Sequence, residues 1–275
     1  MGDVKLQEMT DKEFSIISEY IKNNYGISLS SDKKSLVYSR LKNVLEKKGF
    51  NSFTDYYEHL VNDKTGIEAI VFIDKITTNH TFFMREVDHF KFLKDEVLPK
   101  IEKTAKDKDV RIWCAGCSSG EESYTLEMIL TDYFKGKSGW NTELLATDIS
   151  TEVLKKAIKG IYTKDHVKSL SQDWKKNYFK EFNDNQMIVS DSIKNKITYR
   201  KFNLMEPKFP FKRKFQAIFC RNVMIYFDDK TRTELIRKFY NASEKGAYLF
   251  IGHSETLNNI ETNYEYVMPA VYIKK

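Results

Sequence analysis

The first 75 residues carry apolar side chains at the three- and four-residue spacing of amphipathic helices. Gly26 and Gly49 follow two of these segments and are typical of helix C-terminal caps. The pattern predicts a small all-α N-terminal domain over residues 1–75, with helices in the segments 11–25, 31–48, 52–60 and 66–77. The residues expected to face its core include Phe14, Ile17, Tyr20, Ile21, Val37, Leu41, Val44 and Leu45.

From residue 76 onward, short apolar runs alternate with helical segments. This alternation is typical of a parallel sheet with crossover helices, so residues 76–275 are predicted to form an α/β domain. Residues 161–196 interrupt the alternation with a basic segment that ends in the strand-like QMIVSD, and we expect them to form an inserted subdomain. The C-terminal EYVMPAVYIKK is predicted to add an antiparallel strand. The main strands are predicted at 110–114, 143–147, 197–202, 215–220 and 246–251.

The segment 110–130 combines a buried strand, a turn of small residues and an amphipathic helix. Gly116 and Gly120 bracket the turn, where a ligand can approach the backbone closely. Helix N-termini usually attract phosphate, but Glu121 and Glu122 begin this helix and would repel a pyrophosphate. The pair disfavours a nicotinamide dinucleotide and favours a cofactor with positive charge and hydroxyls, such as S-adenosylmethionine. The alternative is that both carboxylates only offset the helix dipole.

Asp148 ends the next predicted strand, where an acidic residue commonly accepts hydrogen bonds from ribose hydroxyls. It follows Gly116 by 32 positions, more than the roughly 20 of dinucleotide-binding folds, which a longer helix and loop explain. The alternative role for Asp148 is to cap the next helix, although Ser150 can do so itself.

The net charge of +6 is unevenly placed along the chain. Residues 155–201 carry twelve basic and five acidic side chains, and residues 31–48 carry six and two. Such a surface predicts an acidic partner, which can be a nucleic acid, an anionic lipid or an acidic protein. Lys33, Arg40 and Lys47 repeat every seven residues and so form one stripe on the predicted helix. The alternative is that the stripe is a solvated face.

Three cysteines in 275 residues argue against a disulfide scaffold and for a reducing, cytoplasmic location. Cys114 and Cys117 form a C-x-x-C pair, but no further ligands stand at zinc-motif spacing, so we expect no metal. A thioredoxin-like role for the pair is a weaker alternative. No apolar run is long enough for a transmembrane helix, and the N-terminus lacks the apolar core of a signal peptide.

Several blocks of the chain match one family nearly end to end. The chain resembles the chemotaxis receptor methyltransferases, the CheR family. The TTNHTFFMRE and FCRNVMIYF sequences are the specific part of this resemblance. The matching blocks are ITTNHTFFMRE (76–86), GCSSGEESY (116–124), ATDIS (146–150), IYTKDHVKSLS (161–171), FNL (202–204), FQAIFCRNVMIYFD (215–228) and LFIGHSETL (249–257).

The resemblance implies an enzyme that transfers the methyl group of S-adenosylmethionine to glutamate side chains on the cytoplasmic helices of chemoreceptors, leaving S-adenosylhomocysteine. It implies a Rossmann-like methyltransferase domain with a small antiparallel β insertion, preceded by the all-α domain. Neither nucleic-acid binding nor membrane insertion is expected, and the enzyme is expected to be cytoplasmic and recruited to receptor arrays. The implied cofactor contacts are Asn79, Thr81, Arg85, Glu122 (or Glu121), Asp148, Asn203, Leu204, Arg221 and Asn222.

Each implied role has a chemical rationale and an alternative. Arg85 can grip the cofactor carboxylate, or it can pair with Glu86 or Asp88. Asn203 can read the edge of adenine, or it can serve a turn. Asn79 and Thr81 contact the cofactor, or they cap a helix that starts near Thr81.

The catalytic residues implied by the resemblance are Arg85, Arg221 and Tyr226. Tyr226 is placed near the methyl group, and either arginine can orient the incoming carboxylate. A glutamate with a pKa of about 4.3 arrives ionised, so we expect no catalytic base, and none of His80, His89 and His253 is assigned to that role.

The basic stripe of Lys33, Arg40 and Lys47 is predicted to dock on the glutamate-rich receptor helices. The insertion departs from family members that bind a receptor tethering peptide, because EFNDNQMIVS has no glycine and a shorter turn. We therefore expect docking on the receptor body itself. Two alternatives remain open at this point: a methyltransferase that acts on RNA, and a non-catalytic S-adenosylmethionine-binding signalling protein.

Overall fold

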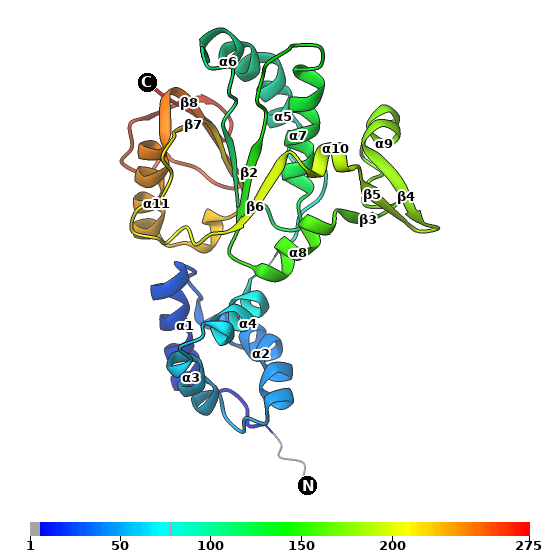
Figure 1. Cartoon of the computed structure of the whole chain (residues 1–275). Coiled ribbons are helices and arrows are strands. Elements are labelled where there is room, and N and C mark those ends of the chain that lie inside the picture. The colour runs from blue at the N-terminus through cyan, green and yellow to red at the C-terminus, as the bar shows by residue number, and fades with distance from the viewer. Residues whose placement is uncertain (1–5, 78) are drawn as a thin grey trace.

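The computed structural model describes residues 6–77 and 79–275, and its N-terminal part is the helical bundle that the hydrophobic spacing predicts (Figure 1). The expected core residues of this bundle are buried, apart from Tyr20, which is half-buried. Helix α2 starts later than predicted, because a 3₁₀ turn at Ser31–Lys33 precedes it and no side chain caps it. The bundle helices are α1 (Asp11–Tyr25), α2 (Lys34–Lys48), α3 (Phe53–Asn62) and α4 (Ile67–Ile76).

The rest of the described chain is built on a sheet with the strand order β6-β2-β1-β7-β8-β10-β9. The first five strands in this order are parallel, which confirms the α/β prediction, and β10 runs antiparallel to both of its neighbours, β8 and β9. All five predicted main strands are present. The bounds are β1 (Ile112–Ala115), β2 (Leu144–Asp148), β6 (Ile197–Lys201), β7 (Phe215–Cys220), β8 (Ser243–Ile251), β9 (Tyr264–Met268) and β10 (Val271–Lys274).

The C-terminal segment differs from the prediction of one added strand. It forms a hairpin of β9 and β10, joined by a turn at Pro269 and Ala270. Proline has no N–H to donate to a ladder, and Ala270 has a left-handed φ of 61°, so the chain reverses at this point.

Helices cover both faces of the central sheet (Figure 1), and alternate residues of a strand point to opposite faces. Ile112 and Cys114 of β1 belong to the apolar core shared with α5, α6 and α7, whereas Trp113 and Ala115 belong to the core shared with α11. The sheet is thus the middle of three layers, as expected for the Rossmann-like domain that the family resemblance implies. The covering elements are α5 (Val87–Phe92), the π-helical turn η2 (Leu93–Val97), α6 (Leu98–Thr104), α7 (Glu121–Tyr133), α8 (Thr151–Lys159) and α11 (Asp229–Ala242).

The predicted insertion contains a second, antiparallel sheet of order β3-β5-β4. Of its three strands, the sequence pattern predicts only β5, which lies within the strand-like QMIVSD. The turn between β4 and β5 holds just Asp184 and Asn185. The elements are β3 (Ile161–Thr163), α9 (Gln172–Tyr178), β4 (Phe179–Asn183), β5 (Gln186–Val189) and α10 (Asp191–Lys194). The limits of the insertion at 161–196 and the domain boundary after residue 75 stay predictions.

The helical bundle contacts the sheet domain near the carboxyl ends of the parallel strands. Ile27 forms an antiparallel bridge with Phe227, and the Ser28 N–H donates to the Tyr226 carbonyl at 2.8 Å. Lys22 pairs with Asp228 at 2.8 Å. These contacts place the end of α1 and the residues that follow it over the edge where open α/β sheets bind ligands. Among the described helices, none is both long enough and apolar enough to cross a membrane.

Candidate cofactor site

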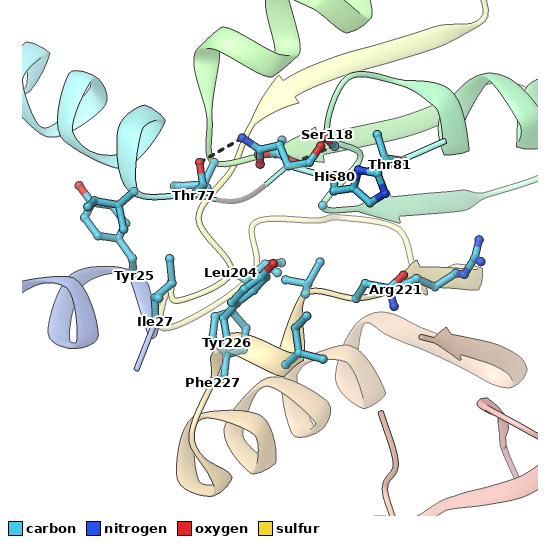
Figure 2. A pocket seen from close by; sticks show the side chains of 18 of the residues that line it. Tyr25, Ile27, Thr77, His80, Thr81, Ser118, Leu204, Arg221, Tyr226 and Phe227 are labelled. Carbon is cyan, nitrogen blue, oxygen red and sulfur yellow. Dashed lines mark hydrogen bonds between the residues drawn. The ribbon is translucent and has the colours of Figure 1, made fainter. Parts of the chain in front are cut away.

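A cavity of about 500 Å³ lies between the helical bundle and the carboxyl edge of the sheet. Its size falls within the roughly 300–1,000 Å³ of small-molecule sites. Figure 2 shows its walls: Tyr25 and Ile27 come from the bundle, His80, Thr81 and Ser118 from loops, and Leu204, Tyr226 and Phe227 from the segments after β6 and β7.

The structure brings together the residues predicted to contact the cofactor. Lys33 and Arg40 of the predicted stripe also line the cavity, whereas Lys47 does not and is exposed farther along α2. Thr78, within the block 76–86, lies outside the described residues. The predicted residues that line the cavity are Asn79, Thr81, Arg85, Glu122, Asp148, Asn203, Leu204, Arg221, Asn222 and Tyr226.

The two glycines of the turn after β1, Gly116 and Gly120, have different structural roles. Gly116 lines the cavity with φ of 91°, and a Cβ there would collide with Val223, so only glycine leaves this wall open. Gly120 does not line it. A Cβ at Gly120 would instead meet Tyr162 and Ala157, so this glycine permits packing against the insertion and α8, rather than the approach of a ligand as predicted.

Glu121 and Glu122 lie in the first turn of α7, but their side chains point in different directions. Glu122 lines the cavity, where it accepts hydrogen bonds from Arg221 at 2.6 Å and from the Cys114 thiol at 3.2 Å. Glu121 is 2% exposed, is bonded to the Ser119 hydroxyl, and lies outside the cavity. Burial raises the pKa of Glu121. Glu122 is therefore the carboxylate of the pair that can meet a cationic ligand.

The C-x-x-C cysteines are part of the strand and turn. Cys114 and Cys117 are both buried, and burial raises the pKa of each thiol well above its usual value. Buried, protonated thiols make poor nucleophiles and poor redox groups. This environment does not favour the thioredoxin-like alternative.

Arg221 is enclosed by the protein, with its side chain 1% exposed. Its guanidinium donates to Glu122, to Glu86 at 3.0 Å and to the Arg85 carbonyl. With these partners in place, the geometry disfavours a direct role in orienting an incoming carboxylate. Arg221 instead holds Glu122 at the cavity wall and neutralises part of its charge.

Arg85 remains the better candidate for binding a carboxylate. It is half-buried, donates to the His80 carbonyl at 3.1 Å and lies over the Phe82 ring. No ion pair of Arg85 occurs within the described residues, so the alternative pairing with Glu86 or Asp88 is not seen. The surrounding backbone is strained, since Met84 and Glu86 have positive φ values.

Asp148 sits at the cavity with its two oxygens already oriented by the backbone. The Ser118 N–H donates to one oxygen at 2.8 Å and the Ser150 N–H to the other at 2.9 Å. Burial raises the pKa of Asp148, and these donors act against that rise. Ser150 caps α8 through Val153, as the sequence suggested, so the capping alternative for Asp148 is not needed.

The three asparagines are partly committed to local structure. Asn203 accepts from Met205 N–H at 3.0 Å and donates to the Asn24 carbonyl at 2.8 Å, which favours its turn role, and the adenine contact stays a prediction. Asn79 accepts at its carbonyl from the Ser118 hydroxyl. No helix starts near Thr81, because α5 begins at Val87, so the capping alternative for Asn79 and Thr81 is wrong. The third, Asn222, donates weakly to Glu86 at 3.5 Å.

Two residues that support the site had no predicted role. Glu255 is 8% exposed and accepts from the N–H groups of Asn222 at 2.9 Å and Ile225 at 3.1 Å, so it holds the loop that carries Tyr226. Ser118 positions Asp148. The sequence signal for Glu255 was its place just after a predicted buried strand, in IGHSE, but nothing in the sequence says which loop it supports.

Comparison with known proteins agrees with this geometry. The family model described as "CheR methyltransferase, SAM binding domain" matches residues 79–273, and "CheR methyltransferase, all-alpha domain" matches residues 12–77.

Relatives that the chain is similar to include the chemotaxis protein methyltransferase of Borreliella burgdorferi, which is 45% identical over 97% of this chain and 95% of the relative. A probable chemotaxis protein methyltransferase of Rhizobium etli is 36% identical over 86% and 90%. The chemotaxis protein methyltransferase of Escherichia coli is 34% identical over 96% and 91%. The chain therefore belongs to the CheR methyltransferase family and is an S-adenosylmethionine-dependent methyltransferase.

Proposed function

We propose that the protein methylates glutamate side chains on the cytoplasmic helices of chemoreceptors and acts in the cytoplasm at receptor arrays. The observation that supports this most is the composition of the cavity. Carboxylates suited to the cofactor, Glu122 and Asp148, line the same cavity as Lys33 and Arg40 of the bundle. Such an arrangement accommodates a cationic cofactor on one side and an acidic helix on the other.

The residues present fit S-adenosylmethionine, whose sulfonium supplies the methyl group. Glu122 offers a carboxylate to its ammonium, Asp148 offers one to the ribose hydroxyls, and Gly116 leaves room for close approach. Arg85, which lines the same cavity, binds its carboxylate in this proposal. The substrate glutamate is already ionised at neutral pH, so the protein needs to orient and desolvate it, without removing a proton.

The rim of the cavity matches a helix that carries glutamates between apolar residues. Leu36, Phe82 and Ile225 are exposed apolar side chains that line the cavity, and Lys33, with 51% of its side chain exposed, lies among them. The two-residue turn between β4 and β5 supports docking on the receptor body, rather than capture of a tethering peptide at the insertion. RNA as the acceptor gains no support, because the basic insertion contributes no residue to the cavity wall.

The test is methyl transfer to receptor-rich membranes from S-adenosylmethionine labelled in the methyl group. We expect label on a receptor-sized band that mild base releases as methanol, because carboxylate esters hydrolyse under conditions that spare N-methyl groups. Label that resists base, or label found only on added RNA, would contradict the proposal. Calorimetric binding of S-adenosylhomocysteine, measured in parallel, separates a wrong acceptor from a failed cofactor site.

A further inference from the structure

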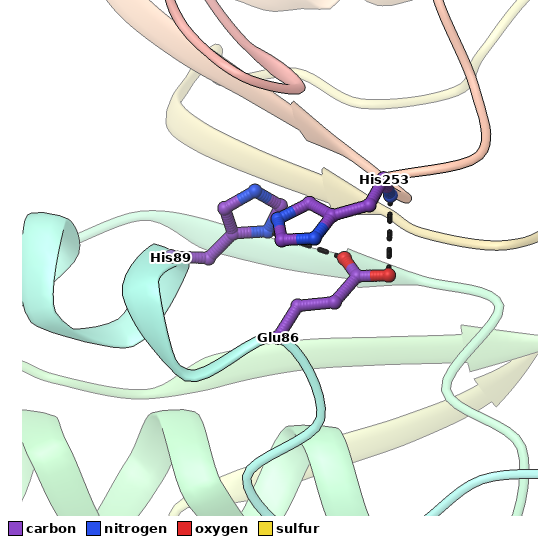
Figure 3. A group of neighbouring side chains, drawn as sticks. All are labelled: Glu86, His89 and His253. Atoms are coloured by element: carbon purple, nitrogen blue, oxygen red, sulfur yellow. Dashed lines mark hydrogen bonds and ion pairs between the residues drawn. The ribbon is translucent and has the colours of Figure 1, made fainter.

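Glu86, His89 and His253 converge outside the cofactor cavity (Figure 3). Glu86 and His89 stand at the start of α5, and His253 follows β8, 167 positions after Glu86. One ligand atom from each residue lies within 4.8 Å of the other two. His89 is fully buried, Glu86 is half-buried and His253 is exposed, so the cluster is open to solvent on the His253 side.

The hydrogen bonding of His89 fixes its tautomer. Its Nε2 lies 3.2 Å from the Pro269 carbonyl, which can only accept, so Nε2 carries the proton. In the neutral ring Nδ1 then presents a lone pair, and this buried atom has no hydrogen-bond partner. It lies 3.6 Å from a Glu86 carboxylate oxygen, so two acceptors face each other.

The donors around Glu86 do not reach the His89 Nδ1. The Arg221 guanidinium donates to Glu86 at 3.0 Å and the His253 N–H donates to it at 3.1 Å. The buried Nδ1 therefore keeps no partner on the side that faces Glu86. A cation between the two acceptors would satisfy both.

We propose that Glu86, His89 and His253 bind a divalent transition metal ion of the Zn²⁺ class, with solvent as a further ligand. Two imidazoles and a carboxylate form a ligand set that Zn²⁺ uses with an open position. Metal-binding histidines typically donate their other ring N–H to a backbone carbonyl, as His89 does to Pro269. The site departs from the prediction that no metal is bound, because its ligands come from distant parts of the chain rather than from a C-x-x-C motif.

Arg221 is the main electrostatic objection, since its guanidinium lies 3.0 Å from Glu86. Arg221 also pairs with Glu122 at 2.6 Å. The negative charge of the two carboxylates therefore exceeds the single positive charge of the guanidinium, which leaves net negative charge to attract a cation. The loosest ligand is His253, whose exposed ring can move the short distance that close coordination requires.

The experiment is titration of the full-length protein, stripped of metal, with Zn²⁺ followed by calorimetry, and with Co²⁺ followed by absorption spectroscopy. We expect one equivalent to bind, with the weak visible bands of nitrogen and oxygen ligation, and Zn²⁺ to raise the melting temperature. His253→Ala removes an exposed ligand with little risk to folding and should weaken binding at least tenfold. His166→Ala, a surface histidine elsewhere, is the matched control and should leave it unchanged.

Binding that His253→Ala leaves intact would overturn the proposal, as would an intense thiolate charge-transfer band or the absence of saturable binding. These readouts do not depend on methyl transfer, so they stand whether or not the acceptor is a receptor glutamate.

Discussion

At the scale of single residues, the site depends on which neighbour of a pair faces the cavity. The residue types alone do not distinguish Glu121 from Glu122, because both begin the same helix, and only the family resemblance favours Glu122. Their side chains leave the helix about 100° apart, so Glu122 reaches the cavity and Glu121 packs beside Ser119. The chemistry of the loop is thus predictable from residue types, whereas the physical reason for choosing Glu122 over its neighbour is the direction of the helix.

Replacing Glu122 by glutamine should weaken cofactor binding. The change removes a charge from the cavity wall, and hydrogen bonds to charged groups contribute about 1.5–3 kcal/mol, which corresponds to about 10–100-fold in Kd. Calorimetry with S-adenosylhomocysteine measures this loss. Glu121→Gln is the matched control at the same helix turn and should change Kd less than twofold. Equal losses in the two variants would refute the assignment of Glu122.

Arg221 illustrates why the roles of residues are harder to predict than their positions. The family resemblance implies that Arg221 contacts the cofactor or orients the incoming carboxylate, and the structure places Arg221 in the cavity wall. Two carboxylates of the protein, Glu86 and Glu122, already occupy its donors. One of them stands 135 positions away in the chain, and such a pairing is visible only once the fold is known.

At the scale of elements, strands that are buried along their whole length are predictable from their apolar sequences, whereas exposed strands are not. Strand β7 is buried at every position and β1 likewise, which matches the apolar runs found in the sequence. Strand β4 is exposed at all positions but its first, so its sequence, FKEFN, carries no apolar run. It is held by pairing with β5, and local sequence does not encode that partner.

Helix α7 carries a buried carboxylic acid that should make stability depend on pH. Glu127 is fully buried, and burial raises its pKa to about 8 although Lys196 lies 3.7 Å away. The folded state therefore keeps a proton that the unfolded chain, with a pKa near 4.5, releases. The free energy of unfolding should fall as pH rises between these two values, and it should level off above the folded pKa.

Glu127→Gln should remove this dependence, because glutamine does not ionise. From about pH 5 to about pH 8, wild type should lose about 1–3 kcal/mol more stability than the variant. Urea unfolding at the two pH values measures the difference. Glu46→Gln, an exposed carboxylate on α2, serves as the control. Parallel pH profiles for wild type and Glu127→Gln would show that Glu127 is ionised in the folded protein.

The 3₁₀ turn Ser31–Lys33 and the helix α2 that follows it are the elements that we propose meet the receptor. Lys33→Glu replaces an attraction for an acidic helix by a repulsion at the cavity rim. An exposed charge interaction contributes about 1 kcal/mol, and its loss should raise the KM for receptor about fivefold. Lys47→Glu, beyond the cavity, should have a smaller effect, and Lys103→Glu, on α6, none. Methylation rates at varied receptor concentration measure KM. The Kd for S-adenosylhomocysteine should stay constant, and a KM unaffected by Lys33→Glu would count against docking on α2.

At the scale of the whole molecule, the cavity belongs to neither part of the protein alone. Tyr25 and Ile27 come from the bundle, while Asp148, Leu204 and Tyr226 come from the sheet domain. The two sets are held together by contacts at the end of α1. The sequence predicted both parts separately, but it gave no sign that the bundle forms a wall of the cofactor site, because contacts between distant segments leave no periodic pattern.

Gly26 and Gly49 offer a test of whether the position of the bundle affects the cofactor site. They end α1 and α2 in the same left-handed conformation, with φ of 73° and 77°. A Cβ at Gly49 meets nothing, whereas one at Gly26 would strike Met205, next to Leu204 in the cavity wall. Gly49→Ala should cost about 1–2 kcal/mol of stability through backbone strain alone. Gly26→Ala should cost a further 1–3 kcal/mol or so from overpacking.

Only Gly26→Ala should also weaken S-adenosylhomocysteine binding, because it displaces a wall that the two parts share. Thermal unfolding and calorimetry on both variants measure the two effects separately. Adding Met205→Ala to Gly26→Ala removes the collision but keeps the strained φ, so binding should recover while part of the stability loss remains. Equal binding by the Gly26 and Gly49 variants would mean that the bundle can shift without disturbing the cofactor site.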